Sequence, residues 1–249
     1  MTTDLRQVVV LAGGLATRLG QRATALPKYL QPVAGKPFAY WQLERIAASG
    51  FNSALLCIGH LGDAIEDTLG DGSTWGLNID YVEDGPEPLG TGGALVGALH
   101  QLQPTFVVTY GDSYLPFDYS EPLEDLRAHP EALGTMSVYR NQGRFDRSNT
   151  RIDGDRVVTY AKDASAARRH ELDCIDYGAT ALRRTAVQQL GAGPSELSTL
   201  QAQLAKQGQL RAWLASQRFY EIGSEQGLAE LDAFLTSPVA GIETPEAAS

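Results

Sequence analysis

The chain has 249 residues, of which 43% are hydrophobic and 20% are charged, and its formal net charge is -10. This length allows one large α/β domain, or two small ones, with a sizeable core. The acidic balance excludes a broad electrostatic attraction to nucleic acid or to an anionic membrane. A phosphate compound would therefore be bound by a few local cations and by backbone N–H groups.

The N-terminal segment and the cysteines favour a cytoplasmic protein. Met1-Thr2-Thr3-Asp4 carries no basic or apolar signal region, and no apolar run approaches the roughly 20 residues that span a bilayer. Cys57 lies in an apolar run and is expected to be a buried thiol. It is far from Cys174 in sequence, so a disulfide framework is not expected.

Short apolar runs alternate with amphipathic stretches in the first 140 residues. The pattern predicts five strands and four helices, with strands near 7–11, 54–58, 78–83, 105–110 and 134–140 and helices near 37–49, 62–69, 91–102 and 120–128. Alternation at this spacing implies right-handed crossovers and a mostly parallel sheet. We therefore expect an α/β fold.

The alternation of apolar runs and amphipathic stretches ends after residue 140. Residues 151–158 predict a hairpin that turns at Asp153-Gly154. A strand is expected at 174–182, a helix at 196–206, an extended segment at 211–222 and a last helix at 224–235. One domain is expected over 1–236, and the Pro-, Glu-, Ala- and Ser-rich tail 237–249 is expected to be disordered.

Ligands of parallel sheets bind at the carboxyl ends of the strands, and two strand ends are of interest. The first strand ends in Ala12-Gly13-Gly14, where exposed N–H groups can bind phosphate oxygens, and the cations Arg18 and Lys28 follow. The second ends in Gly111-Asp112. Neither a G-x-G-x-x-G nor a Walker A pattern is present. From these residues alone, a tight turn with two solvent-facing cations is an equally good interpretation.

The whole N-terminal stretch is more specific than its parts. Segments 11–19, 26–30 and 32–37 resemble the signature of the sugar-1-phosphate nucleotidyltransferases. The likeness is to the short bacterial enzymes that activate heptose-1-phosphate or mannose-1-phosphate with GTP. Ala16 stands where the family usually has Gly. The resemblance implies a Rossmann-like three-layer fold, with a nucleotide-binding part over about 1–140 and a sugar-phosphate part over about 141–236.

Five later segments match the family in order. Residues 87–94 resemble its second motif, near the base and sugar of the nucleotide; Thr91 could instead cap the following helix. Gly111-Asp112 resembles the strand end that holds magnesium. Lys162 follows Ala161, where the family has Glu, and Asp176 stands where it often has Asn. Glu221 stands where it has an Asp that binds magnesium.

The resemblance implies that a sugar-1-phosphate oxygen attacks the α-phosphorus of a nucleoside triphosphate and that pyrophosphate leaves. The nucleophile is already anionic, so no general base is needed, and positioning and charge stabilisation carry the catalysis. The implied roles are catalysis for Arg18, Lys28 and Lys162; nucleotide binding for Leu11, Ala12, Gly13, Gly14, Thr17, Glu87, Gly90 and Thr91; sugar-phosphate binding for Lys162, Asp176 and Gly178; and magnesium binding for Asp112 and Glu221.

Several alternatives stay open at this point. The acceptor could be a non-sugar phosphate, as in molybdopterin-type or phosphocholine-type cytidylyltransferases, or the chain could be a catalytically silent nucleotide-binding subunit. The base depends on residues around 84–90, so UTP, CTP and dTTP compete with GTP. The oligomeric state is open, a homodimer included. None of the four histidines is assigned a catalytic role, and His60 is interpreted as an ordinary loop residue rather than a residue of the cleft.

Overall fold

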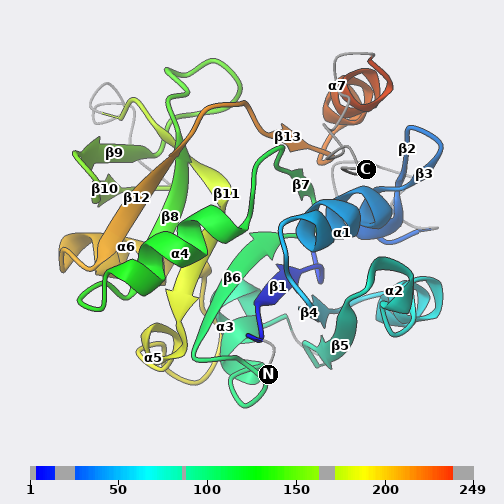
Figure 1. Ribbon diagram of the computed structural model, residues 1–249, viewed down its shortest axis with the longest axis horizontal. Coiled ribbons are helices and arrows are strands. Elements are labelled where there is room, and N and C mark those ends of the chain that lie inside the picture. Colours follow the sequence, from blue (N-terminus) through cyan, green and yellow to red (C-terminus); the bar gives the residue numbers. More distant parts are fainter. Residues whose placement is uncertain (1–3, 15–25, 86–87, 163–171, 238–249) are drawn as a thin grey trace, which may run out of the picture.

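The computed structural model describes residues 4–14, 26–85, 88–162 and 172–237 (Figure 1). Its strands are β1 (Gln7–Leu11), β2 (Pro32–Val33), β3 (Lys36–Pro37), β4 (Ser53–Ile58), β5 (Asn78–Glu83), β6 (Thr105–Tyr110), β7 (Ser113–Tyr114), β8 (Gly134–Tyr139), β9 (Thr150–Asp153), β10 (Arg156–Tyr160), β11 (Ile175–Arg183), β12 (Leu210–Ala215) and β13 (Tyr220–Glu221). Its helices are α1 (Phe38–Ala48), α2 (Gly62–Leu69), α3 (Gly90–Gly97), α4 (Ser120–Ala128), α5 (Arg184–Val187), α6 (Leu197–Lys206) and α7 (Glu225–Thr236), with 3-10 turns η2 (Lys28–Leu30) and η3 (Ser73–Trp75).

The main sheet has nine strands within the described ranges, in the order β5-β4-β1-β6-β11-β8-β12-β10-β9. Strands β5, β4, β1 and β6 pair in parallel, and so do β8 and β12. Only β11 and β10 run against the other strands of this sheet. The expected α/β fold with a mostly parallel sheet is therefore confirmed.

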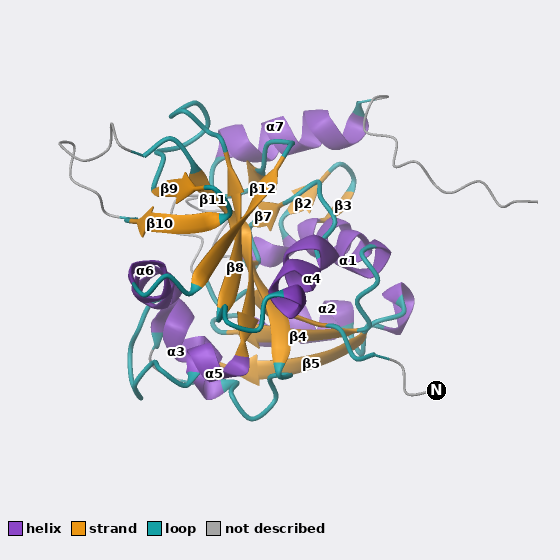
Figure 2. Ribbon diagram, turned by 60° about the vertical axis from the view of Figure 1, so that its left-hand side comes forward, coloured by secondary structure: helices purple, strands orange, loops and turns teal. Residues whose placement is uncertain are grey.

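Strand β1 lies at the centre of the parallel part because it is apolar on both faces. Val8, Val9, Val10 and Leu11 are all buried. Since side chains alternate along a strand, Val8 and Val10 pack into the core under α1, α2, α4 and α7. Val9 and Leu11 pack into the core under α3, α5 and α6. Figure 2 shows α1, α2 and α4 on one side of the sheet and α3, α5 and α6 on the other, which gives the three layers.

The sequence patterns located most elements but not all of them. The predicted helix over 91–102 ends at Gly97, and turns continue to residue 101. The hairpin at Asp153-Gly154 is confirmed, with β9 antiparallel to β10. The antiparallel insertion of β11 between β6 and β8 was not predicted, because an apolar run looks the same in either direction. The two-residue strands β7 and β13 carry no sequence signal.

Strands from both halves of the chain join one sheet, because β11 pairs with β6 on one side and with β8 on the other. The carboxyl ends of β5, β4, β1 and β6 thereby meet at one edge, facing the second half of the chain. Among the described helices, none combines the length and the apolar character that crossing a membrane requires.

One buried arginine on β12 joins this strand to α4 and to the β9–β10 turn. Arg211 on β12 has a side chain only 8% exposed. Its Nε and Nη2 atoms donate to Asp125 of α4 at 2.8 and 3.0 Å, and Nη1 donates to Asp155 of the β9–β10 turn at 2.7 Å. Although burial raises the pKa of Asp125, the hydrogen bonds from Arg211 and Thr135 outweigh it and lower that pKa overall.

The Arg211→Ala variant is expected to lose about 3 kcal/mol of unfolding free energy, because Asp125 keeps a partly buried charge without its partner. Since Asp125 has a depressed pKa when folded, this stabilisation is present above the ordinary carboxyl pKa of about 3.9 and is lost as the pH falls through the lower folded value. Urea denaturation at pH 7 and at pH 3 measures both effects. The control is Arg151→Ala, which removes an exposed arginine on β9, two strands from β12. An equal loss in that variant would contradict the prediction.

Candidate active site

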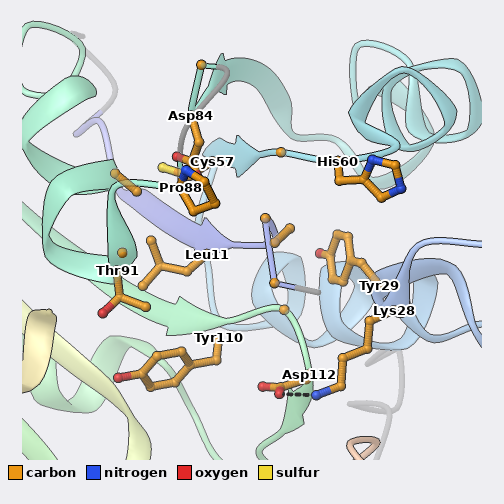
Figure 3. A pocket seen from close by; sticks show the side chains of 18 of the residues that line it. Leu11, Lys28, Tyr29, Cys57, His60, Asp84, Pro88, Thr91, Tyr110 and Asp112 are labelled. Atoms are coloured by element: carbon orange, nitrogen blue, oxygen red, sulfur yellow. Dashed lines mark hydrogen bonds and ion pairs between the residues drawn. The ribbon is translucent and has the colours of Figure 1, made fainter. Parts of the chain in front are cut away.

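A cavity of about 700 Å³ opens at the carboxyl ends of the parallel strands (Figure 3). The end of β1 contributes residues 11–14, the end of β4 contributes Cys57, Gly59 and His60, and the end of β6 contributes residues 110–112. The segment after β5 and the start of α3 also line it, as do Lys28 and Lys162. The cavity lies where parallel sheets place their ligands.

The turn after β1 is hydrogen-bonded to the ends of the two strands beside it, β4 and β6. Ala12 N donates to Cys57 O at 2.8 Å, and Gly111 N donates to Leu11 O at 3.0 Å. A Cβ atom on Gly111 would stand 3.0 Å from the Ala12 Cα atom, so the backbones at the ends of β1 and β6 touch. Among the described residues, no atom lies within 4 Å of a Cβ placed on Gly14. Gly13 and Gly14 thus present their backbone to an open cavity, as a phosphate-binding turn requires.

Lys28 and Asp112 form the charged centre of the cavity. The Nζ atom of Lys28, on η2, lies 2.5 Å from Oδ2 of Asp112, which follows β6, and their side chains are 18% and 33% exposed. Gln42 of α1 is fully buried and donates to the carbonyls of Tyr110 and Ser113, on either side of Asp112. The turn that carries Asp112 is therefore fixed from the helical layer.

The backbone around Glu221 is hydrogen-bonded to the turn that carries Asp112. It pairs with Ser113 in the β13–β7 ladder, and Ile222 N donates to Asp112 O at 2.9 Å. Gly223 follows, and a Cβ atom there would stand 3.2 Å from Lys28 Nζ. Glu221 is not among the residues that line the cavity, but its strand is hydrogen-bonded to the turn that carries Asp112.

Of the residues expected to bind a sugar phosphate, the structure places only Lys162 in the cavity wall. The carboxyl group of Asp176, on β11, accepts from Gly178 N at 3.0 Å and from the Tyr160 hydroxyl at 3.2 Å. Burial raises the pKa of Asp176, while Gly178, Tyr160 and the charge of Lys162 act to lower it. Gly178 has φ +101° and lies against Ser113. Both residues therefore stand behind the wall, next to the strand that ends in Asp112.

Gly90 of the second motif lines the cavity, and the glycines of this motif also pack against the segment that precedes α6. A Cβ atom on Gly90 would stand 2.6 Å from Ser195 O, and Gly92 N donates to the same oxygen at 2.8 Å. The expectation that Thr91 caps its own helix is wrong, because α3 begins at Gly90 and has no side-chain cap. The Thr91 hydroxyl instead donates to Glu196 at 2.8 Å and accepts from Leu197 N, the first residue of α6.

Several wall residues were not identified from the sequence. His60, interpreted as an ordinary loop residue, lines the cavity, and so do Asp84 and Tyr110. Burial raises the pKa of Tyr110 well above its usual range, which keeps its hydroxyl a neutral donor. Cys57 is a free buried thiol, as predicted. Burial and the charge of Asp84 raise its pKa to about 12. All of these follow or end a parallel strand, so treating every strand end alike would have found them.

Three of the expected site residues lie outside the described residues. These are Thr17, Arg18 and Glu87. Leu11, Ala12, Gly13, Gly14, Lys28, Gly90, Thr91, Asp112 and Lys162 are brought together in one cavity. The residues come from five separate stretches of the chain, which only the tertiary fold joins.

Residues 8–221 match the family model described as a MobA-like NTP transferase domain. The chain is 38% identical over 132 residues to N-acetylmuramate alpha-1-phosphate uridylyltransferase of Neisseria meningitidis, an alignment that covers 51% of this chain and 55% of that protein. It is 34% identical over 161 residues to mannose-1-phosphate guanylyltransferase of Mycobacterium tuberculosis, covering 64% and 45%. The chain thus spans about half the length of these curated relatives.

The fold is also similar to solved structures. HddC from Yersinia pseudotuberculosis, crystallised with GMP-PN, superposes with a TM-score of 0.75 at 24% identity, over 92% of this chain and 98% of that one. At this identity the likeness supports the fold, and it agrees with the three layers described above.

Gly227, at the start of α7, is expected to be needed as glycine, because a Cβ atom there would stand far too close to the Glu221 carbonyl oxygen. We expect Gly227→Ala to lower the free energy of unfolding by about 1–3 kcal/mol, as overpacking does. Gly97→Ala is the matched control, since its Cβ atom would meet open space in α3 and should raise stability by up to about 1 kcal/mol. Chemical denaturation of both variants measures the contrast. Equal stability of the two variants would contradict it.

Proposed function

This chain belongs to the MobA-like NTP transferase domain family, and we propose that it transfers a nucleotidyl group from a nucleoside triphosphate to a sugar 1-phosphate with release of pyrophosphate. The observation that carries the proposal is the Lys28–Asp112 pair, held at 2.5 Å beside a glycine turn in one cavity. The named activities of both curated relatives, a uridylyltransferase and a guanylyltransferase acting on sugar phosphates, support the same class.

The reaction brings several anions together, so the chain's contribution is to position and neutralise them. The backbone N–H groups of Gly13 and Gly14 would bind triphosphate oxygens at the end of β1. Lys28, whose side chain is mostly buried, would contact the α-phosphate, where negative charge grows in the transition state. Arg18 is proposed to neutralise the departing pyrophosphate. The attacking phosphate oxygen is already ionised, so no side chain has to remove a proton.

Magnesium is the metal that we propose for this site, with Asp112 and Glu221 as its protein ligands. The donor set fits: Asp112 keeps a partly exposed carboxylate in the cavity, and Glu221 lies on the strand bonded to its turn. No group of three or more metal-binding side chains occurs among the described residues. This suits a metal that takes most of its ligands from water and substrate phosphates. When bound, magnesium would neutralise phosphate charge.

The acceptor is proposed to lie between Lys162 and the β11 segment. Lys162 is the exposed cation of the cavity wall and would hold the sugar phosphate. Asp176 and Gly178 lie behind it, and Asp176 would contact a sugar hydroxyl only with the side chain in another rotamer. Ala161 provides no carboxylate at this wall. We propose a heptose or hexose 1-phosphate, with GTP as the donor and the cytoplasm as the compartment.

A pyrophosphate-release assay tests the proposal directly. The purified chain is incubated with magnesium, each of GTP, UTP, CTP and dTTP, and a panel of heptose, hexose and amino-sugar 1-phosphates. Release with one pair, abolished by EDTA, is the expected result. No release with any pair, while a nucleotide still raises the melting temperature, would contradict a sugar-phosphate acceptor and favour a different acceptor or a silent nucleotide-binding subunit.

Lys28→Ala is expected to lower turnover by about 100-fold or more, because loss of one preorganised donor to the reacting phosphate costs about 3–4 kcal/mol of transition-state stabilisation. Lys36→Ala is the matched control: Lys36 pairs with Glu44 and lies over the Trp41 ring, and it does not line the cavity. Turnover within a few-fold of wild type in the Lys28 variant would remove Lys28 from the mechanism.

A further inference from the structure

The strand that carries Glu221 is too short to be stable by its own pairing. Strand β13 consists of Tyr220 and Glu221, and among the described strands it pairs with β7 alone. Two isolated strands are marginally stable even when they are longer than this. Figure 1 shows β13 beside β7, where the chain leads into α7. Glu221 is exposed, so burial does not fix its side chain. The direction of its carboxylate therefore depends on the contacts of the residue next to it.

The guanidinium group of Arg218 lies against two aromatic rings. Its Cζ atom is 4.0 Å from the centre of the Phe145 ring and 4.4 Å from the centre of the Tyr220 ring. The Tyr220 ring is stacked in turn on Phe234 of α7, with 4.6 Å between the ring centres. The Nη2 atom of Arg218 donates to Glu230 of α7 at 2.7 Å. Arg218 thus joins the loop between β8 and β9, strand β13 and helix α7.

These contacts act on Glu221 through the geometry of the strand. A planar guanidinium group can lie on aromatic rings and still donate hydrogen bonds in its own plane, so Arg218 holds Tyr220 and α7 at once. Successive side chains of a strand point to opposite faces. Fixing Tyr220 on one face of β13 therefore fixes Glu221 on the other.

The charge of Glu221 is felt inside the cavity. Burial raises the pKa of Tyr110, a residue of the cavity wall, and the charges of Asp112 and Glu221 add to that effect. Glu221 and Asp112 thus act on the same part of the wall, although Glu221 itself does not line the cavity.

We propose that Arg218 is a positioning residue for Glu221: by holding Tyr220 against α7, it keeps the Glu221 carboxylate directed toward the metal position beside Asp112. The inference rests on the proposed function, in which Glu221 and Asp112 bind magnesium. Neither Arg218 nor Tyr220 is among the residues that line the cavity. A role in packing alone would lower the stability of Arg218 variants and leave their metal affinity unchanged.

Binding of Mn²⁺, used in place of Mg²⁺, tests the proposal, because the electron paramagnetic resonance signal of free Mn²⁺ reports affinity without turnover. Arg218→Ala is expected to weaken Mn²⁺ binding about 10-fold, as loss of a group that orients a metal ligand does. Glu221→Gln should weaken it at least as much. The double variant should bind no more weakly than Glu221→Gln, because Arg218 acts through Glu221. Wild-type affinity in either single variant would overturn the proposal.

Tyr220 provides a second test with a matched control. Tyr220→Leu removes the ring and should weaken Mn²⁺ binding as Arg218→Ala does, whereas Tyr220→Phe keeps the ring and should bind like the wild type. Should Arg218→Ala fail to fold, this pair decides, and equal affinities of the two Tyr220 variants would overturn the proposal.

Arg144→Ala is the control for loss of an arginine beside the same ring. Arg144 is exposed, and its Cζ atom is 5.7 Å from the centre of the Phe145 ring. This variant should keep wild-type Mn²⁺ affinity. A loss equal to that in Arg218→Ala would contradict a specific role for Arg218.

The proposed transferase activity is measured separately on the same preparations. With the substrate pair that releases pyrophosphate, Arg218→Ala should need about 10-fold more magnesium for half-maximal turnover, a larger effect than on the maximal rate. Mn²⁺ binding that depends on Arg218, without pyrophosphate release from any pair, would contradict the activity and leave the positioning role intact. Release with an unchanged magnesium requirement in Arg218→Ala would do the reverse.

Discussion

The close approach of the ends of β1 and β6 is the constraint on which the site depends. The two backbones touch at Ala12 and Gly111, and each strand end is hydrogen-bonded to its neighbour across the sheet. This contact fixes the distance between the glycine turn, which can bind phosphate, and Asp112, which carries the negative charge of the site. A side chain at Gly111 would push the end of β6, and Asp112 with it, away from the glycine turn after β1.

Each helical layer supports a different part of the cavity wall. Gln42 of α1 holds the turn around Asp112 from one side. On the other side, α3 docks through its glycines on the Ser195–Glu196 backbone and so joins the first half of the chain to α6. The glycines of the second motif are therefore explained by packing between elements as well as by access for a nucleotide. This packing joins α3 to α6, and Gln201 of α6 in turn donates to Asp176 of β11, the strand beside which the sugar is proposed to bind.

The two ends of the cavity differ in the charged side chains that line them. Lys28 and Lys162 bring positive charge to the cavity of a chain whose formal net charge is -10. Figure 3 shows Asp84 at the opposite end from Lys28, and its Oδ1 atom is buried and has no hydrogen-bond partner among the described residues. An anionic ligand would therefore be oriented by repulsion at one end as well as by attraction at the other.

The sequence by itself determined the strand–helix alternation, the glycine turn after Leu11 and the strand-end position of Asp112, because these depend on local patterns of apolar residues, glycines and charges. It also determined the family, through a motif that is contiguous in the chain. The antiparallel position of β11, the meeting of Glu221 with the Asp112 turn and the docking of Thr91 on α6 were decided by the tertiary structure. Each of these contacts joins residues between about 70 and 110 positions apart in the sequence. The local pattern around an apolar run or a single carboxylate does not indicate which distant residue it will contact. Asp84 shows the same limit, since only the fold reveals that its carboxyl group lies beside Gly13 with one oxygen buried.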